Sequence, residues 1–191
     1  ISISNVVVQS NINTFGSLAM AGIGTYTKIE GFAFLPITSF MMALTTFVSQ
    51  NRGAREFDRA RKGAHFGLTC SVSLAEVIGL LIALFAEPLM RLFVNDPQVI
   101  QYGIERAHYA TILFFLLAYS HGVSAVLRGV GKSVVPMIVM LVCWCFVRVT
   151  LLTALNMMFH NIIFVYMIYP FTWALSSVVF FLYYRKINWQ E

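Results

Sequence analysis

Long apolar runs alternate with short polar connections along this 191-residue chain. A helix that crosses the hydrocarbon core of a bilayer needs about 20 predominantly apolar residues. Because lipid offers no hydrogen-bond partner to backbone amides, such runs cross a membrane as helices. The pattern predicts six spans, at 1–23, 32–50, 64–86, 107–127, 136–157 and 162–183. We therefore expect an all-α membrane protein built as a six-helix bundle.

The composition also predicts that the chain lies in a lipid bilayer, which is then one of its partners. Hydrophobic residues make up 59% of the chain and charged residues 11%, against about 25% charged residues in an average soluble domain. The formal net charge is +5, but the basic residues lie between the apolar runs, so we expect no nucleic-acid partner. Cys70, Cys143 and Cys145 fall inside predicted spans without metal-ligand spacing, which predicts no metal site and no bound cofactor.

Basic residues are unevenly divided between the two sets of connections. Five lie between Arg52 and Lys62, and with the fourth connection and the C-terminal tail they make nine on one side of the membrane. The other side has three, Lys28, Arg91 and Arg106. Cytoplasmic loops are enriched in Lys and Arg. We therefore expect a multi-pass protein of a cell membrane, the bacterial inner membrane, with a cytoplasmic C-terminus.

The outer connection before the fourth span carries its own helix signals. Asp96 is a suitable N-cap and Pro97 suits the first turn of the helix that follows. Just upstream, the residues 88–93 predict a short helix lying in the membrane interface.

Amide side chains in the first span lie on one helix face. Asn5, Gln9 and Asn13 are spaced at steps of four. A polar stripe in a membrane helix faces the protein interior or a water-filled cavity, so Gln9, Asn13 and Asn5 are candidates to line a substrate cavity. The alternative is that these amides hydrogen-bond across helices and hold the bundle together.

Two opposite charges fall inside predicted spans. Glu76 and Arg148 each lie about 18 Å from the cytoplasmic end of their span, at about 1.5 Å per residue. Equal depth makes them a candidate intramembrane charge pair, with Glu76 titrating during ion coupling. A purely structural pair and a shift in the span boundaries are the alternatives. Trp144, one turn before Arg148, is placed to stack on its guanidinium.

Three further residues are candidates for a substrate cavity. Met41 offers a soft, adaptable surface for varied apolar compounds. Tyr119 offers cation–π attraction, and His121 a ring that titrates near neutral pH. Lipid contact or ordinary packing explains the same residues equally simply.

A hydrolase is the alternative from a different class. Gly122 and Ser124, next to His121, resemble part of a serine nucleophile motif, but Val126 stands where that motif requires its last glycine. We therefore do not expect an enzyme.

Two connections carry residues that resemble a known transporter family. The turn after the second span resembles the one that follows the second helix of each lobe in multidrug and toxic compound extrusion (MATE) transporters, through Gln50, Asn51, Gly53, Ala54, Arg59 and Arg61. The fourth connection resembles the Leu-Arg-Gly-x-Gly turn of that family, through Leu127, Arg128, Gly129 and Gly131. Phe93, Asp96 and Pro97 are similar to its outer loop.

The resemblance implies a twelve-helix carrier of two six-helix lobes, of which this chain is the C-terminal one without the start of its first helix. The N-terminal lobe, absent from this sequence, is then its partner. Such carriers export small organic compounds, often cationic, by antiport with H⁺ or Na⁺ through alternating access. One branch of the family has coupling carboxylates in helices one and four of this lobe, where this chain has none before Glu30 and none in 107–127. The main coupling acid would then lie in the other lobe.

Two alternatives to the drug exporter share the membrane fold. A lipid-linked oligosaccharide flippase has a strongly cationic cavity, whereas Arg148 is the one cation predicted at membrane depth here. The other alternative is a partner subunit that does not itself transport.

Overall fold

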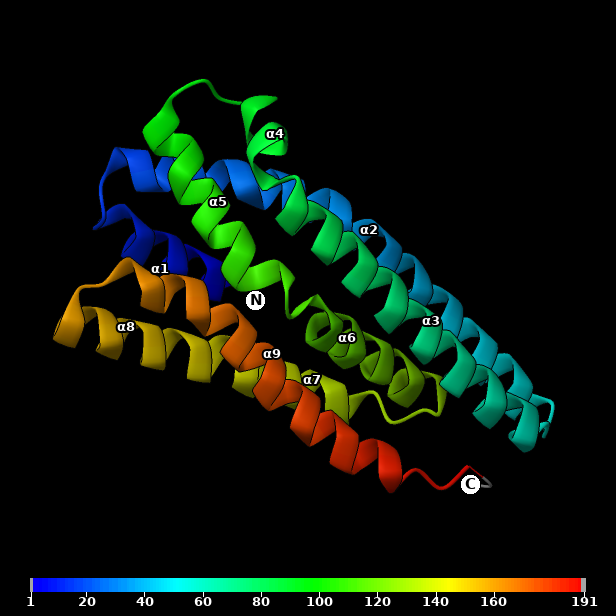
Figure 1. Cartoon of the computed structure of the whole chain (residues 1–191). Helices are drawn as coiled ribbons and strands as arrows, with labels where there is room; N and C mark the ends of the chain where they lie inside the picture. The colour runs from blue at the N-terminus through cyan, green and yellow to red at the C-terminus, as the bar shows by residue number, and fades with distance from the viewer. Residues whose placement is uncertain (1, 190–191) are drawn as a thin grey trace.

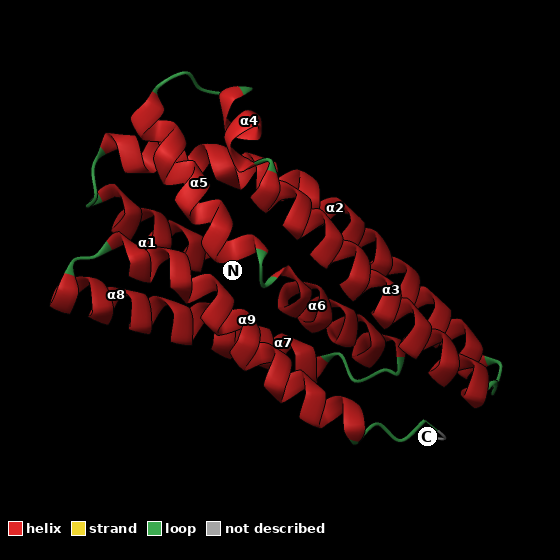
Figure 2. Cartoon of the chain, in the orientation of Figure 1, coloured by secondary structure: helices red, strands yellow, loops and turns green. Residues whose placement is uncertain are grey.

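A computed structural model describes residues 2–189, with side chains from Ser4 onward. Within that range the chain consists of helices and short connections, without a strand (Figure 2). The helices are α1 (Ser2–Asn13), α2 (Ser17–Gly53), α3 (Phe57–Leu84), α4 (Ala86–Arg91), α5 (Pro97–Thr111), α6 (Phe114–Gly129), α7 (Val134–Leu141), the π-helix η1 (Val142–Val147), α8 (Arg148–Phe159) and α9 (Ile162–Arg185). Ile1, the first residue of the first predicted span, lies outside the described residues.

Four of the described helices are long and apolar enough to cross a membrane: α2, α3, the continuous run Val134–Phe159 and α9. The pair α5 and α6, bent by 54°, adds a fifth span if the two helices are counted as one. α1 occupies the place of the first predicted span but has 12 residues. The all-α membrane bundle expected from the apolar runs is confirmed.

The boundary between the first two spans differs from the prediction. The break expected at 24–31 is absent, because α2 runs unbroken through those residues and through Pro36. The break lies instead at Gly16, whose φ of 95° is accessible to glycine at little cost. The prediction placed a connection at 24–31, between the apolar runs 1–23 and 32–50. Tyr26 and Ile29 are instead buried in the core and hold this part of the chain in the helix.

The fourth predicted span, 107–127, is also interrupted. α5 ends at Thr111 and α6 begins at Phe114, so the span is a bent pair that starts ten residues earlier than predicted. Asp96 caps α5 as expected, its Oδ1 accepting from the amide of Gln98 at 2.9 Å, with Pro97 in the first turn. The short interfacial helix is α4.

The connections alternate between the two ends of the bundle. The α2–α3 turn, the α6–α7 connection and the C-terminal segment lie at one end, and the α4–α5 and α8–α9 connections at the other (Figure 1). This arrangement agrees with the division of basic residues found in the sequence.

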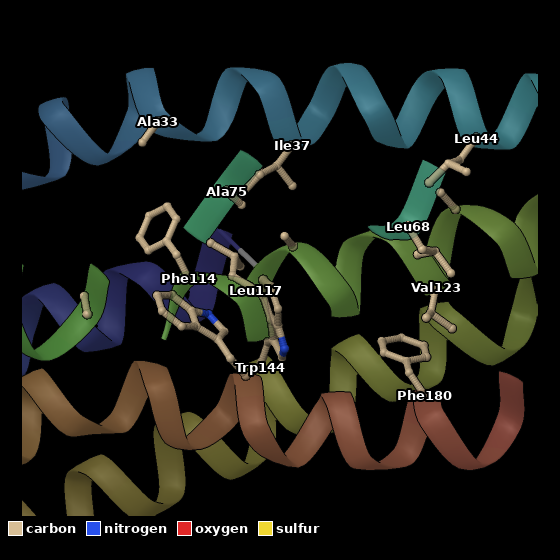
Figure 3. Packing of buried hydrophobic residues seen from close by; sticks show 14 of the residues in the cluster. Ala33, Ile37, Leu44, Leu68, Ala75, Phe114, Leu117, Val123, Trp144 and Phe180 are labelled. Carbon is tan, nitrogen blue, oxygen red and sulfur yellow. The ribbon is translucent and has the colours of Figure 1, made fainter. Parts of the chain in front are cut away.

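The main core lies where α2, α3, α6 and α9 meet. Leu44, Leu68, Val123 and Phe180 approach one another there, one from each of these helices (Figure 3). Trp144 of η1 belongs to the same cluster. This packing holds η1 against α6 and α9 and so positions the polar residues described next.

Candidate functional site

A π-helix interrupts the span Val134–Phe159 near its middle. η1 covers Val142–Val147, and Arg148 follows it directly. A π-helical turn widens the backbone by one residue per turn and is frequent at functional sites. Here it places the Trp144 ring in the core and brings Arg148 against α9.

Arg148 is buried between η1 and α9, with 3% of its surface exposed. Its Nη2 donates to Thr172 Oγ1 at 2.7 Å. Its guanidinium carbon lies 5.2 Å from the Trp144 ring centre, so the stacking expected from the sequence is present. The same carbon lies 4.6 Å from the ring centre of Tyr169.

The position of Arg106 differs most from the one that the sequence predicted. It was expected in an outer connection, but it lies inside α5 with 2% of its surface exposed. Its Nη1 donates to the carbonyl oxygen of Tyr166 at 3.1 Å. Its guanidinium carbon lies 4.1 Å from the ring centre of Tyr169 and 5.6 Å from that of Tyr26. The two buried arginines therefore share one tyrosine ring.

Glu30 of α2 is a carboxylate that lies within reach of the charges of both arginines. Its side chain is half-buried. Within residues 2–189 the one ion pair with nitrogen and oxygen closer than 4.0 Å joins Arg91 to Glu87, at 2.8 Å. Neither buried arginine thus has a carboxylate in direct contact. We call Tyr26, Glu30, Arg106, Arg148 and Tyr169 the internal charge cluster.

A group of buried hydroxyls supports Trp144 from the other side. Ser120 Oγ lies 2.9 Å from the hydroxyls of both Ser176 and Ser177. Trp144 Nε1 donates to Ser176 Oγ at 3.1 Å. His121 packs edge-on against Trp144, with ring centres 5.1 Å apart, and neither of its ring nitrogens has a hydrogen-bond partner. These contacts hold the Trp144 ring in place, and Arg148 packs over this ring.

Glu76 does not pair with Arg148, so that prediction is wrong for the described structure. Its Oε2 instead accepts from the backbone amide of Phe115 at 3.0 Å. Phe115 lies in the first turn of α6, where amides lack partners within the helix. The bend between α5 and α6 leaves this amide without a partner in its own helix, and no local pattern predicted the bend.

The residues predicted to line a cavity are not gathered into one place. Gln9 Nε2 donates to Asn13 Oδ1 at 3.2 Å on an exposed face of α1, and Asn5 is exposed as well. Met41 packs against the main core. Tyr119 borders a separate cleft of about 500 Å³, with Tyr184 among its lining residues. Their role in binding substrate stays a prediction.

The two family-like turns meet at one end of the bundle. An Nη1 hydrogen bond from Arg52 to the carbonyl of Val130 joins them. Together they border an open cleft of about 680 Å³, lined by Ser49, Arg52, Gly53, Arg55, Phe57, Gly129 and Gly131. The other signature residues flank it: Gln50, Asn51, Ala54, Arg59 and Arg128.

Glycine permits the second turn to adopt this shape. Gly131 has a φ of 83°, and a side chain on Gly129 would meet the carbonyl oxygen of Thr45 at 3.0 Å. The glycines of this family-like turn are therefore required by the close packing of α6 against α2.

The geometry gives no support to a serine hydrolase. Ser124 Oγ is buried without a hydrogen-bond partner, and so are both ring nitrogens of His121. A serine nucleophile needs a base within hydrogen-bonding distance. The two residues thus do not form a catalytic pair.

A helical membrane bundle with a broken span and a charged interior is the construction of a secondary transporter. The chain belongs to the MatE family, whose model matches residues 1–155. Proteins of this family are transporters rather than enzymes. The resemblance read from the two turns is confirmed.

Related proteins agree with that assignment. Over 193 residues the chain is 26% identical to the probable multidrug resistance protein YoeA of Bacillus subtilis, covering 100% of this chain and 41% of YoeA. It is 28% identical to the probable multidrug resistance protein NorM of Thermotoga maritima, covering 72% of this chain and 31% of NorM. The chain thus spans less than half the length of these relatives.

Solved structures share the fold. A crystal structure of MATE in the bent conformation superposes on 98% of this chain and 42% of its own, with a TM-score of 0.89 and 15% sequence identity. The chain therefore has the fold of one lobe of these two-lobe transporters.

Proposed function

We propose that this chain is the C-terminal lobe of a multidrug efflux transporter that exports small organic compounds, often cationic, across a cell membrane. The match of residues 1–155 to the MatE family model carries the proposal. The probable multidrug resistance proteins YoeA and NorM support it, because their similarity to this chain extends over 100% and 72% of its length.

The mechanism we propose is alternating access between this lobe and an N-terminal lobe. In repeat-built carriers the substrate site lies between the two halves, near the bilayer midplane. The exposed amides of Gln9 and Asn13 on α1 suit one wall of such a site, because their donors and acceptors are available to a ligand. The driving ion is H⁺ or Na⁺, taken up in exchange for the substrate.

The decisive experiment uses the complete transporter in a drug-sensitive bacterial host. Expression is expected to raise resistance to ethidium, and residues 1–191 alone are expected to confer none, since one wall of the cavity would be missing. In proteoliposomes, dye efflux should follow an imposed gradient of H⁺ or of Na⁺. Good expression without a gain in resistance to any cationic dye would contradict the export function.

A flippase for lipid-linked oligosaccharides is the second candidate, and one observation favours it. The sequence indicated one cation at membrane depth, Arg148, but Arg106 is buried against the same tyrosine ring. A more cationic interior suits a substrate that carries phosphate. Flipping of a fluorescent lipid-linked sugar by the reconstituted protein, without efflux of ethidium, would favour this candidate.

A further inference from the structure

Resting on the proposed transport function, we propose that Arg106, Arg148 and Tyr26 form a binding site for the oxyanion group, carboxylate or phosphate, of an organic substrate. The site lies inside the lobe, between α2, α5, η1 and α9. It would give the carrier a class of anionic substrates in addition to cationic drugs. Three observations carry this inference.

The first observation is a surplus of positive charge in the lobe interior. Arg106 and Arg148 keep 2% and 3% of their surfaces exposed, and among the described residues neither has a carboxylate oxygen within 4.0 Å. Positive charge therefore remains inside the helix bundle without a counter-charge in direct contact. A charged side chain there is costly, and those retained mark substrate or ion pathways. An anion entering the cluster would neutralise the remaining charge.

The second observation concerns the acceptors that the guanidinium groups have within the described residues. A guanidinium has five N–H donors in a planar fork that matches carboxylate and phosphate. Arg106 gives one to the carbonyl of Tyr166. Arg148 directs Nε and Nη2 to the single hydroxyl of Thr172, at 3.3 and 2.7 Å. Both arginines thus bond to neutral oxygens, while the acceptor that they bind most strongly is an oxyanion.

The third observation is an orphaned hydroxyl beside them. Tyr26 is fully buried, at 0% exposed, and its hydroxyl has no hydrogen-bond partner. Its ring centre lies 5.6 Å from the guanidinium carbon of Arg106. A buried polar group without a partner costs free energy unless a ligand or water satisfies it. An oxyanion would accept this hydrogen and the arginine hydrogens together.

Aromatic rings complete the site for an organic anion. Tyr169 lies against both guanidinium groups, and the Trp144 ring centre lies 5.2 Å from the guanidinium carbon of Arg148. Arginines backed by aromatic faces keep their charge and their orientation in an apolar setting. The low exposure of both arginines means that the ligand enters when helices separate. α1 lies against η1, since Ser4 Oγ donates to the carbonyl of Trp144 at 2.9 Å.

The experiment compares two dyes that share a xanthene ring, the anion carboxyfluorescein and the cation rhodamine 6G. Equilibrium binding to the purified complete transporter is measured without any gradient. Arg106→Gln and Arg148→Gln are each expected to weaken carboxyfluorescein binding at least about tenfold, leaving rhodamine 6G unchanged or more tightly bound. Glu30→Gln should strengthen carboxyfluorescein binding. Competition with benzoate and with phenyl phosphate tells which oxyanion the site prefers.

Tyr26→Phe keeps the test decisive if the arginine variants fail to fold. It removes the unpartnered hydroxyl and little else, so the melting temperature should hold or rise while carboxyfluorescein binding weakens about threefold or more. Arg91→Gln and Tyr183→Phe, at exposed positions, are the matched controls and should leave both dyes unchanged. Unchanged carboxyfluorescein binding in Tyr26→Phe, or equal losses for both dyes in the arginine variants, would overturn the site.

The two proposals fail separately in these measurements. Carboxyfluorescein binding that depends on the cluster, with no gradient-driven efflux of any dye, contradicts the export function and leaves the site standing. Efflux of ethidium by a protein whose binding of carboxyfluorescein is insensitive to Arg106, Arg148 and Tyr26 contradicts the site and leaves the export function standing.

Discussion

The carboxylate of Glu76 on α3 accepts a hydrogen bond from the backbone amide of Phe115, 3.0 Å away in the first turn of α6. Phe115 is 39 residues further along the chain. A residue on a neighbouring helix thus supplies the acceptor that a helix start normally takes from its own N-cap. The contact stabilises the bend of the α5–α6 span at the point where its own hydrogen bonds are interrupted.

Replacing Glu76 by Ala should destabilise the protein by about 1–3 kcal/mol, because a backbone amide loses its acceptor. Glu76→Gln keeps an acceptor oxygen and should cost less. Thermal unfolding of the complete transporter in detergent measures the difference. Glu87→Ala removes a carboxylate from an exposed pair with Arg91 and serves as control, with a cost of about 0–1 kcal/mol. Equal melting temperatures for Glu76→Ala and Glu87→Ala would show that the Phe115 contact contributes nothing.

Two glycines on α2 should respond in opposite ways to the same substitution. A Cβ at Gly22 would lie 2.5 Å from the carbonyl oxygen of Val99 and 2.6 Å from Cβ of Tyr102, whereas one at Gly24 meets nothing within 4 Å. Gly22→Ala should therefore push α5 away and lower the melting temperature by several degrees. Gly24→Ala should be neutral or stabilise by about 0.5–1 kcal/mol. Similar melting curves for the two variants would argue against the close approach of α2 and α5.

The direction of the chain in the membrane can be tested by cysteine labelling. We expect single cysteines at Arg55 and Lys186 to be protected from a membrane-impermeant maleimide added to intact cells. A cysteine at Asn95, in the α4–α5 connection, should react. The physical reason is that the Lys- and Arg-rich connections stay on the cytoplasmic side. Labelling of the Arg55 position but not of the Lys186 position would contradict the arrangement of the two ends.

Substitutions on the exposed face of α1 should change which compounds are exported. Gln9→Ala and Asn13→Ala remove the two amides that hydrogen-bond to each other at 3.2 Å. We expect either change to shift the relative resistance to several dyes by about threefold or more, since each removes polar groups available to a substrate. Cys70→Ala, on α3, is the control and should leave the profile unchanged. A profile that moves equally with all three variants would point to stability rather than to substrate contact.

Local patterns were sufficient for most helices. An apolar run of about 20 residues predicts a span because its own composition determines the free energy of transferring it from lipid to water. Asp96 and Pro97 predicted the start of α5 because a cap and its first turn are neighbours in sequence. The two glycine-rich turns also carried the family resemblance, since their residues are contiguous.

Local patterns failed where a neighbouring helix decided the outcome. The end of the first apolar run at 23 predicted a connection that holds Lys28, yet burial of Tyr26 and Ile29 in the core keeps these residues within α2. Local helix preference is a weak signal that tertiary packing overrides. The signal that could have corrected the boundary is the spacing of three between Tyr26 and Ile29, which places both on one helix face.

The sequence by itself determined that the chain is helical, that it lies in a membrane, and which transporter family it belongs to, because hydropathy and contiguous turn motifs are local properties. Only the tertiary structure decided which charges lie inside the lobe. Arg106 meets the carbonyl of Tyr166, 60 residues away, and Glu76 meets Phe115 instead of Arg148. A polar residue in a membrane helix can face lipid, water or protein, and the packing of the neighbouring helices determines which of these it contacts.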